Sequence, residues 1–109
     1  MPGPRLRDLI DKDAARELEL YMSNDEGIYR QHTLPIQANL RKRIARGVFD
    51  ADRSVALWMY QVEAAAKKYT RQFDSPGARW SDVFSPATRR FVAKRIARDF
   101  MAEEGVLPR

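Results

Sequence analysis

The chain contains no cysteine among its 109 residues. Disulfide bonds, thiolate nucleophiles and cysteine-ligated zinc sites are therefore excluded. Histidine occurs once, and His32 has no carboxylate partner in helical register that would make it a general base. Glycine-rich phosphate loops and nucleophile motifs are also missing. We therefore expect no catalytic residue, metal or cofactor, and a protein that is not an enzyme.

Long hydrophobic runs are missing as well. The longest, Val55 to Tyr60, is far shorter than a membrane span, and the amino terminus carries charges where a signal peptide is apolar. We therefore expect a cytoplasmic protein without membrane contact. Five glycines and six prolines are too few for a disordered or fibrous chain. The length predicts one domain, 1–109, with a folded core at about 5–105.

Positive charge is plentiful but unevenly distributed. Residues 1–26 hold four Lys or Arg and seven Asp or Glu, whereas residues 27–109 hold sixteen and eight, and the net charge is +5. A basic body of this kind can attract nucleic acid, anionic lipid or an acidic protein, and the acidic segment can equally neutralise it from within. The charge alone does not distinguish these possibilities.

Apolar residues recur at helical spacing and rarely alternate as in strands. The sequence predicts an all-α, single-domain bundle of about four helices, at about 6–22, 26–46, 51–73 and 86–104. Asp50 and Ser85 are expected to cap the third and fourth helices, and Gly47 and Gly105 to end the second and fourth. Pro35 lies inside the second helix and should kink it.

Two apolar faces are expected on the third helix, which we predict to be central. The main core face comprises Ala51, Val55, Trp58, Val62, Ala66, Tyr69 and Phe73. A shorter strip of Leu57, Tyr60 and Ala64 lies opposite. Neighbouring helices could cover this strip, or Leu57 and Tyr60 could contact a partner. On the first helix, Leu6, Ile10, Ala14, Leu18 and Tyr21 form the expected core stripe.

The pentapeptide Lys42-Arg43-Ile44-Ala45-Arg46 recurs unchanged as Lys94-Arg95-Ile96-Ala97-Arg98. In each copy the isoleucine is expected to point inward and the cations outward. Around both copies the cations are not interspersed with acids, unlike ordinary surface helices. A solvated helix face would explain part of this pattern, and a binding surface would explain the rest.

The candidate contacts for nucleic acid or an acidic partner are cations of the second and fourth helices together with one aromatic residue. These residues are Arg41, Lys42, Arg43, Arg46, Arg89, Arg90, Phe91, Lys94, Arg95 and Arg98. Phe91 projects among cations and could stack on an unpaired base, or it could pack against an adjoining helix. We also expect Trp80 and Phe84 to anchor the preceding loop to the core.

Several segments carry a family resemblance. The segments 17–21, 24–31, 40–50 and 57–69, among them Leu57-Trp58-Met59-Tyr60 and Ala64-Ala65-Ala66-Lys67-Lys68-Tyr69, resemble small uncharacterised helical proteins of bacteriophages and bacterial mobile elements. The resemblance carries no mechanism. It implies an accessory protein that acts on nucleic acid or on a host complex.

The leading hypothesis is a non-catalytic accessory protein that binds DNA or RNA backbone with little sequence specificity. No helix-turn-helix, zinc-finger or RNA-recognition pattern is present, so phosphate contacts should dominate. The alternative is an inhibitor or adaptor of a host complex that uses the same cations or the apolar strip. The sequence leaves open the oligomeric state and whether the two basic faces form one surface.

Overall fold

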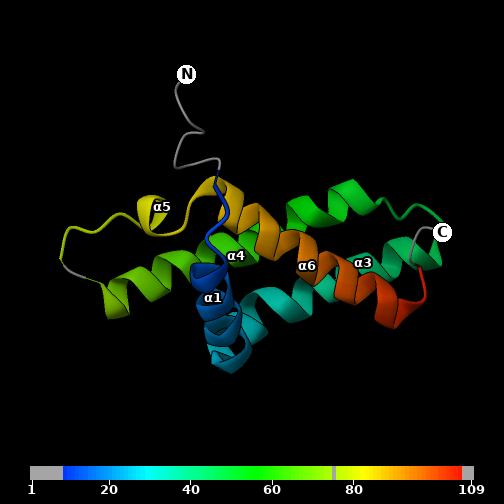
Figure 1. The fold of residues 1–109 in the computed structure, drawn as a ribbon. Coiled ribbons are helices and arrows are strands. Elements are labelled where there is room, and N and C mark those ends of the chain that lie inside the picture. Colours follow the sequence, from blue (N-terminus) through cyan, green and yellow to red (C-terminus); the bar gives the residue numbers. More distant parts are fainter. Residues whose placement is uncertain (1–8, 75, 107–109) are drawn as a thin grey trace, which may run out of the picture.

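A computed structural model describes residues 9–74 and 76–106 of the chain. Regular structure in these ranges is entirely helical, without strands, which confirms the all-α prediction (Figure 1). The elements are α1 (Lys12–Asn24), α2 (Glu26–Ile28), a π-helical turn (Tyr29–Thr33), α3 (Leu34–Ala45), α4 (Ala51–Phe73), α5 (Trp80–Val83) and α6 (Pro86–Glu104). The four predicted helices correspond to α1, the run from α2 to α3, α4, and α6.

The first helix begins later than expected. Asp11 caps α1 by accepting a hydrogen bond from the Ala14 amide at 3.0 Å, so the helix starts at Lys12. Ile10 precedes this cap and is exposed, and its predicted place in the core stripe is wrong. The predicted start at Leu6, like the beginning of the 5–105 core, lies outside the described residues.

The run from α2 to α3 accommodates its proline through a wider turn. Proline lacks an amide hydrogen, and in a regular α-helix its ring clashes with the carbonyl four residues earlier. Residues Tyr29–Thr33 form a π-helical turn, closed by a hydrogen bond from the Leu34 amide to the Tyr29 carbonyl. Pro35 therefore lies in the first turn of α3, where a missing amide is tolerated. The kink predicted at Pro35 corresponds to this π-helical turn, which directly precedes α3.

The core is centred on the contact between α4 and α6. α4 contacts every other helical element, and its most extensive contact is with α6, which crosses it in Figure 1. Trp58 and Val62 of α4 are buried in one cluster with Val92 and Phe100 of α6, and the ring centroids of Trp58 and Phe100 lie 5.8 Å apart. Four alanines of these two helices are buried in the same cluster: Ala65, Ala66, Ala93 and Ala97. Such small side chains permit close approach of the two helix axes.

The predicted core face of α4 is only partly correct. Phe73 is 64% exposed, because it lies in the last turn, beyond the reach of α6. It instead packs at the surface against Tyr21 and Tyr69, with ring centroids 6.0 and 4.9 Å away. Tyr69 donates a hydrogen bond to Glu17 at 2.6 Å, which raises the pKa of Tyr69 to about 12. These contacts attach α1 to the end of α4.

The single turn α5 holds the loop before α6 against the core. Phe84 is fully buried and Trp80 is half-buried, as expected for a loop anchor. Ser85 caps α6 through the Thr88 amide, and its hydroxyl also donates to the Leu9 carbonyl at 2.9 Å. Thr88 accepts a hydrogen bond from the Asp11 amide, so the starts of α1 and α6 are joined.

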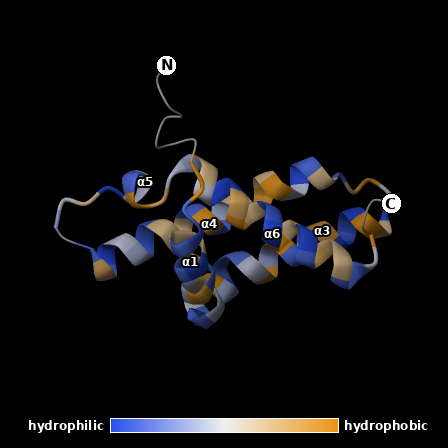
Figure 2. Ribbon diagram, viewed as in Figure 1, coloured by the Kyte–Doolittle hydropathy of each residue, from blue (hydrophilic) through white to orange (hydrophobic). Residues whose placement is uncertain are grey.

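The resulting molecule is flat, with extents of 44 × 39 × 17 Å. Figure 2 shows hydrophobic and hydrophilic residues sharing every long helix, as expected for helices with one buried side. No helix in the described part of the chain combines the length and the apolar character needed to cross a membrane.

Asp25 connects the turn between α1 and α2 to the central helix. Its carboxylate accepts a hydrogen bond from the Ile28 amide at 2.8 Å and lies 2.8 Å from the Lys68 ammonium of α4. The hydrogen bond from Lys68, followed by that from Ile28, holds the pKa of Asp25 below its usual 3.8. The folded state therefore favours the ionised carboxylate.

We expect Asp25→Ala to lower the free energy of unfolding by about 1–2 kcal/mol at neutral pH, because it removes a helix cap and an ion pair. A depressed pKa stabilises the fold above the unfolded value, and this stabilisation is lost as the pH falls through the folded value. The difference between Asp25→Ala and wild type should therefore shrink below pH 3.8 in urea titrations. An equal loss for Asp82→Asn, an exposed acid on α5, would contradict this assignment.

Candidate nucleic-acid interface

Four candidate residues form a stripe along the exposed side of α6. Their spacing of three and four residues places them on one helix face: Phe91, Lys94, Arg95 and Arg98. Lys94 and Arg98 are exposed, and neither forms an ion pair with any residue that the structure describes. Both charges are therefore available to an external anion.

The aromatic member of the stripe is not a free stacking surface. Phe91 is half-buried and packs against the core, and the Arg95 guanidinium lies 5.6 Å from its ring centroid. Its ring lines a hollow of about 330 Å³ between α1 and α6, together with Lys12, Arg16, Glu19 and Arg95. The packing alternative for Phe91 therefore describes its position better than the stacking alternative.

The hollow combines charges from two distant parts of the chain. Lys12 and Arg16 are exposed on α1, one helical turn apart, and both line the hollow beside Arg95. Glu19 is the one carboxylate in its lining and lies 3.5 Å from Arg95. Three cations against one anion make this a site that favours phosphate or another anion.

Lys12 and Arg16 were missed by the sequence analysis because they belong to the acid-rich segment. The net negative charge of residues 1–26 conceals a local pair of cations at positions i and i+4. Their spacing of four residues, which places both on one helix face, was the only feature of the sequence that could have indicated a shared site. Nothing in the sequence indicates that this pair meets Arg95.

The second basic group lies on α3 and faces away from α6. Arg41 forms an ion pair with Glu104 and lies over the Phe100 ring, so its side of α3 faces α6. Arg41 is thus already neutralised. The remaining cations are rotated from Arg41 by roughly 100° to 160° about the helix axis. These are Lys42, Arg43 and Arg46, which line a separate hollow with Asn39 and Val48.

Arg89 does not belong to either basic group, and its prediction as an exposed contact is wrong. It is only 8% exposed, its Nε donates to the Phe84 carbonyl at 3.0 Å, and its guanidinium lies 4.6 Å from the Trp80 centroid. Burial lowers its pKa, and Glu63 at 3.7 Å partly opposes this shift. Arg89 therefore holds the α5 turn against α6.

Two further candidates, Arg90 of α6 and Tyr60 of α4, line one hollow between these helices. Arg90 is exposed and lines a hollow of about 370 Å³ that also includes Asp52, Glu63 and Tyr60. Tyr60 is 68% exposed, whereas Leu57 packs against the core. The apolar strip predicted on α4 is therefore largely covered, and Tyr60 is its exposed member.

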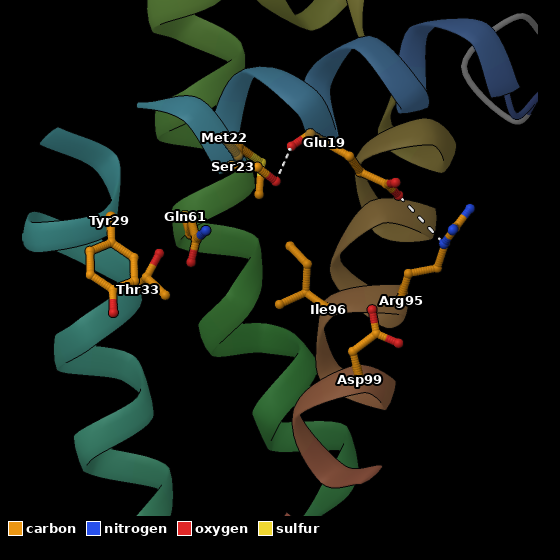
Figure 3. A pocket seen from close by; sticks show the side chains of 9 residues that line it. All are labelled: Glu19, Met22, Ser23, Tyr29, Thr33, Gln61, Arg95, Ile96 and Asp99. Atoms are coloured by element: carbon orange, nitrogen blue, oxygen red, sulfur yellow. Dashed lines mark hydrogen bonds and ion pairs between the residues drawn. The ribbon is translucent and has the colours of Figure 1, made fainter. Parts of the chain in front are cut away.

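A larger cleft lies between α1, the π-helical turn, α4 and α6 (Figure 3). Its volume is about 420 Å³, and its lining is Glu19, Met22, Ser23, Tyr29, Thr33, Gln61, Arg95, Ile96 and Asp99. The Glu19–Arg95 pair belongs to both this cleft and the hollow around Phe91. No sequence motif predicted the cleft, because its residues come from four elements that meet only in the folded chain.

Residues 9–74 and 76–106 contain no cluster of three or more His, Cys, Asp or Glu residues arranged to hold a metal ion. Comparison of the chain with protein-family models, curated proteins and solved structures finds no match.

Arg89 and Arg90 provide a matched test of these placements. We expect Arg89→Ala to lower the free energy of unfolding by about 2–4 kcal/mol, because it leaves the Phe84 carbonyl and Glu63 without their cation. Arg90→Ala, one residue away and exposed, should change it by less than about 0.5 kcal/mol. Urea denaturation followed by circular dichroism would measure both, and equal effects would contradict the burial of Arg89.

Proposed function

We propose that this protein is a non-catalytic accessory protein that binds the backbone of DNA or RNA. The observation that carries the proposal is the cationic hollow of α1 and α6, in which Lys12, Arg16 and Arg95 converge. Lys94 and Arg98 continue this positive surface along α6. The resemblance to proteins of phages and mobile elements is consistent with such a role.

The contact should depend on phosphate rather than on base identity. Arginine and lysine side chains neutralise phosphates, and such contacts position a protein without reading sequence. The one aromatic side chain of the stripe, Phe91, is half-buried, so base stacking is a poor explanation for binding. We therefore propose little sequence specificity and a similar affinity for different sequences of one nucleic-acid form.

The α3 group of Lys42, Arg43 and Arg46 is proposed as a second phosphate contact. It faces away from α6, so a single straight duplex need not touch both groups. The salt dependence of binding reports the number of phosphate contacts, so it distinguishes binding through one group from binding through both. For duplex DNA, the slope of log K against log salt concentration is roughly −2.7 for three phosphate contacts and −5.4 for six.

We expect the triple variant Arg16→Gln, Lys94→Gln, Arg98→Gln to weaken binding at least tenfold at low salt and to flatten the slope by about 2.7. Fluorescence anisotropy with duplex DNA, single-stranded DNA and RNA would measure both quantities. A second triple variant, Lys42→Gln, Arg43→Gln, Arg46→Gln, reports on the α3 group.

The matched control is Arg53→Gln, Arg71→Gln, Arg79→Gln, which removes the same charge from exposed positions outside both groups. Equal weakening by this control would mean that net charge, and not the cationic surface of α1 and α6, drives binding. No binding of any nucleic acid by the wild-type protein, even at low salt, would refute the proposed function.

A second candidate function is a protein-interaction module, favoured by the exposure of Tyr60. Tyr60 lines a hollow together with Val55, Met59 and Arg90. Aromatic and arginine side chains are enriched in protein interfaces. We expect Tyr60→Asp to abolish recovery of a stoichiometric partner from nuclease-treated host lysate while leaving nucleic-acid binding unchanged. Loss of every partner on nuclease treatment would contradict this candidate.

A further inference from the structure

We propose that the cleft between α1, the π-helical turn, α4 and α6 binds a small linear organic amine. This inference does not rest on the proposed nucleic-acid function, because the acceptors that carry it, Gln61, Glu19 and Asp99, are not among the cations proposed to contact phosphate. It rests on two buried acceptor atoms, an excess of acceptors over cations, and the shape of the lining.

The first acceptor is the side-chain oxygen of Gln61. Gln61 is 5% exposed, and its Oε1 has no hydrogen-bond partner within the described ranges. In Figure 3 its amide projects from α4 into the ring of lining residues, near Thr33. Buried polar atoms of this kind are rare in folded proteins and destabilise them unless a donor is supplied. A ligand amine would supply that donor.

The second acceptor is Oε1 of Glu19. This atom is also buried and receives no hydrogen bond from the described part of the protein. Arg95 lies 3.5 Å away, which gives an ion pair without a hydrogen bond. Gln61 and Glu19 both line the cleft, and each has a buried side-chain oxygen without a hydrogen-bond donor in the described part of the protein; Figure 3 shows the Glu19 carboxylate turned toward Arg95.

The charges of the cleft agree with this requirement. Its ionisable lining consists of the carboxylates of Glu19 and Asp99 and the guanidinium of Arg95. Asp99 is exposed and forms no ion pair among residues 9–74 and 76–106. The cleft thus has a net negative charge within a chain of net charge +5, and it favours a cation where the rest of the surface favours anions.

The apolar part of the lining suits a methylene chain. Ile96 is seen in Figure 3 with Gln61 on one side and Arg95 and Asp99 on the other, and Met22 contributes a buried wall. The Tyr29 ring is about half exposed and can attract a cation through its face. A volume of about 420 Å³ falls in the range of small-molecule sites. A linear diamine or polyamine therefore fits, with one nitrogen at Gln61 and another at Asp99.

The π-helical turn is a further reason to select this cleft. Tyr29 and Thr33 are its first and last residues, and both line the cleft. Inserted π-helical turns within α-helices are frequent at functional sites. Pro35 explains why the α-helix is interrupted here, and the interruption supplies two residues of the cleft lining.

The test is a titration of the ligand-free protein with putrescine and spermidine, followed by calorimetry and by amide chemical shifts in NMR. We expect saturable binding, with shifts concentrated in the lining residues and a melting temperature that rises with amine concentration. Acetate and inorganic phosphate, used as anionic probes, should not displace the amine.

Two variants and one control define the site. Asp99→Asn should weaken amine binding about tenfold or more by removing a carboxylate at the cleft edge. Gln61→Met removes the unpaired oxygen at similar length, so it should abolish the amine-induced shift while raising the melting temperature of the free protein. Glu103→Gln removes a carboxylate from the same helix outside the lining and should bind like wild type.

The proposal is overturned if no binding is detected at amine concentrations up to about 5 mM, because a Kd above this value is too weak for a specific site. It is equally overturned if acetate or phosphate binds the cleft in preference to amines, or if Asp99→Asn binds amines as wild type does. Because Asp99 is exposed, its variant should fold and keeps the test decisive even if Gln61→Met does not.

Discussion

The close packing of α4 on α6 is the constraint on which the rest of the structure depends. Ala65 and Ala66 of α4 and Ala93 and Ala97 of α6 are all buried in the core that these helices share. Larger side chains at these positions would force the helices apart, because protein interiors have no spare volume to absorb them. Once α6 is held in this way, its remaining exposed side carries Phe91, Lys94, Arg95 and Arg98. The candidate interface is therefore a consequence of the core.

The acidic amino-terminal segment has two roles in this arrangement. Glu19 and Asp25 form ion pairs with Arg95 and Lys68, so part of the segment neutralises the basic body, as the charge distribution allowed. Lys12 and Arg16 of the same segment do the opposite and add to the positive hollow. The Glu19–Arg95 pair stands between the cationic hollow and the acceptor-rich cleft, and it separates two sites of opposite electrostatic preference.

Local features of the chain were predictable because they depend on few neighbours. Asp50 and Ser85 cap α4 and α6, and α4 spans the predicted residues 51–73. Gly47 and Gly105 follow α3 and α6 with φ of +72°, a left-handed conformation that glycine adopts without strain. The predictions were wrong where contacts between distant parts of the chain determine whether a residue is buried. Ile10 is excluded from the core by the Asp11 cap, and Arg89 is enclosed by Trp80, Phe84 and Glu63.

The repeated pentapeptide separates what sequence determines from what tertiary structure decides. The second copy lies within α6, and the first ends α3, with Arg46 as the C-cap residue. Both isoleucines, Ile44 and Ile96, pack partly against the core, as the spacing of apolar residues required. Yet Ala45 is exposed, whereas Ala97 is 1% exposed. The sequence by itself determined the helices and the angular order of the cations around them. Tertiary structure decided how much of each helix is covered, because α6 packs against both α4 and α1 while α3 has a single buried side. That difference places one copy beside the hollow and the cleft and leaves the other on a separate surface.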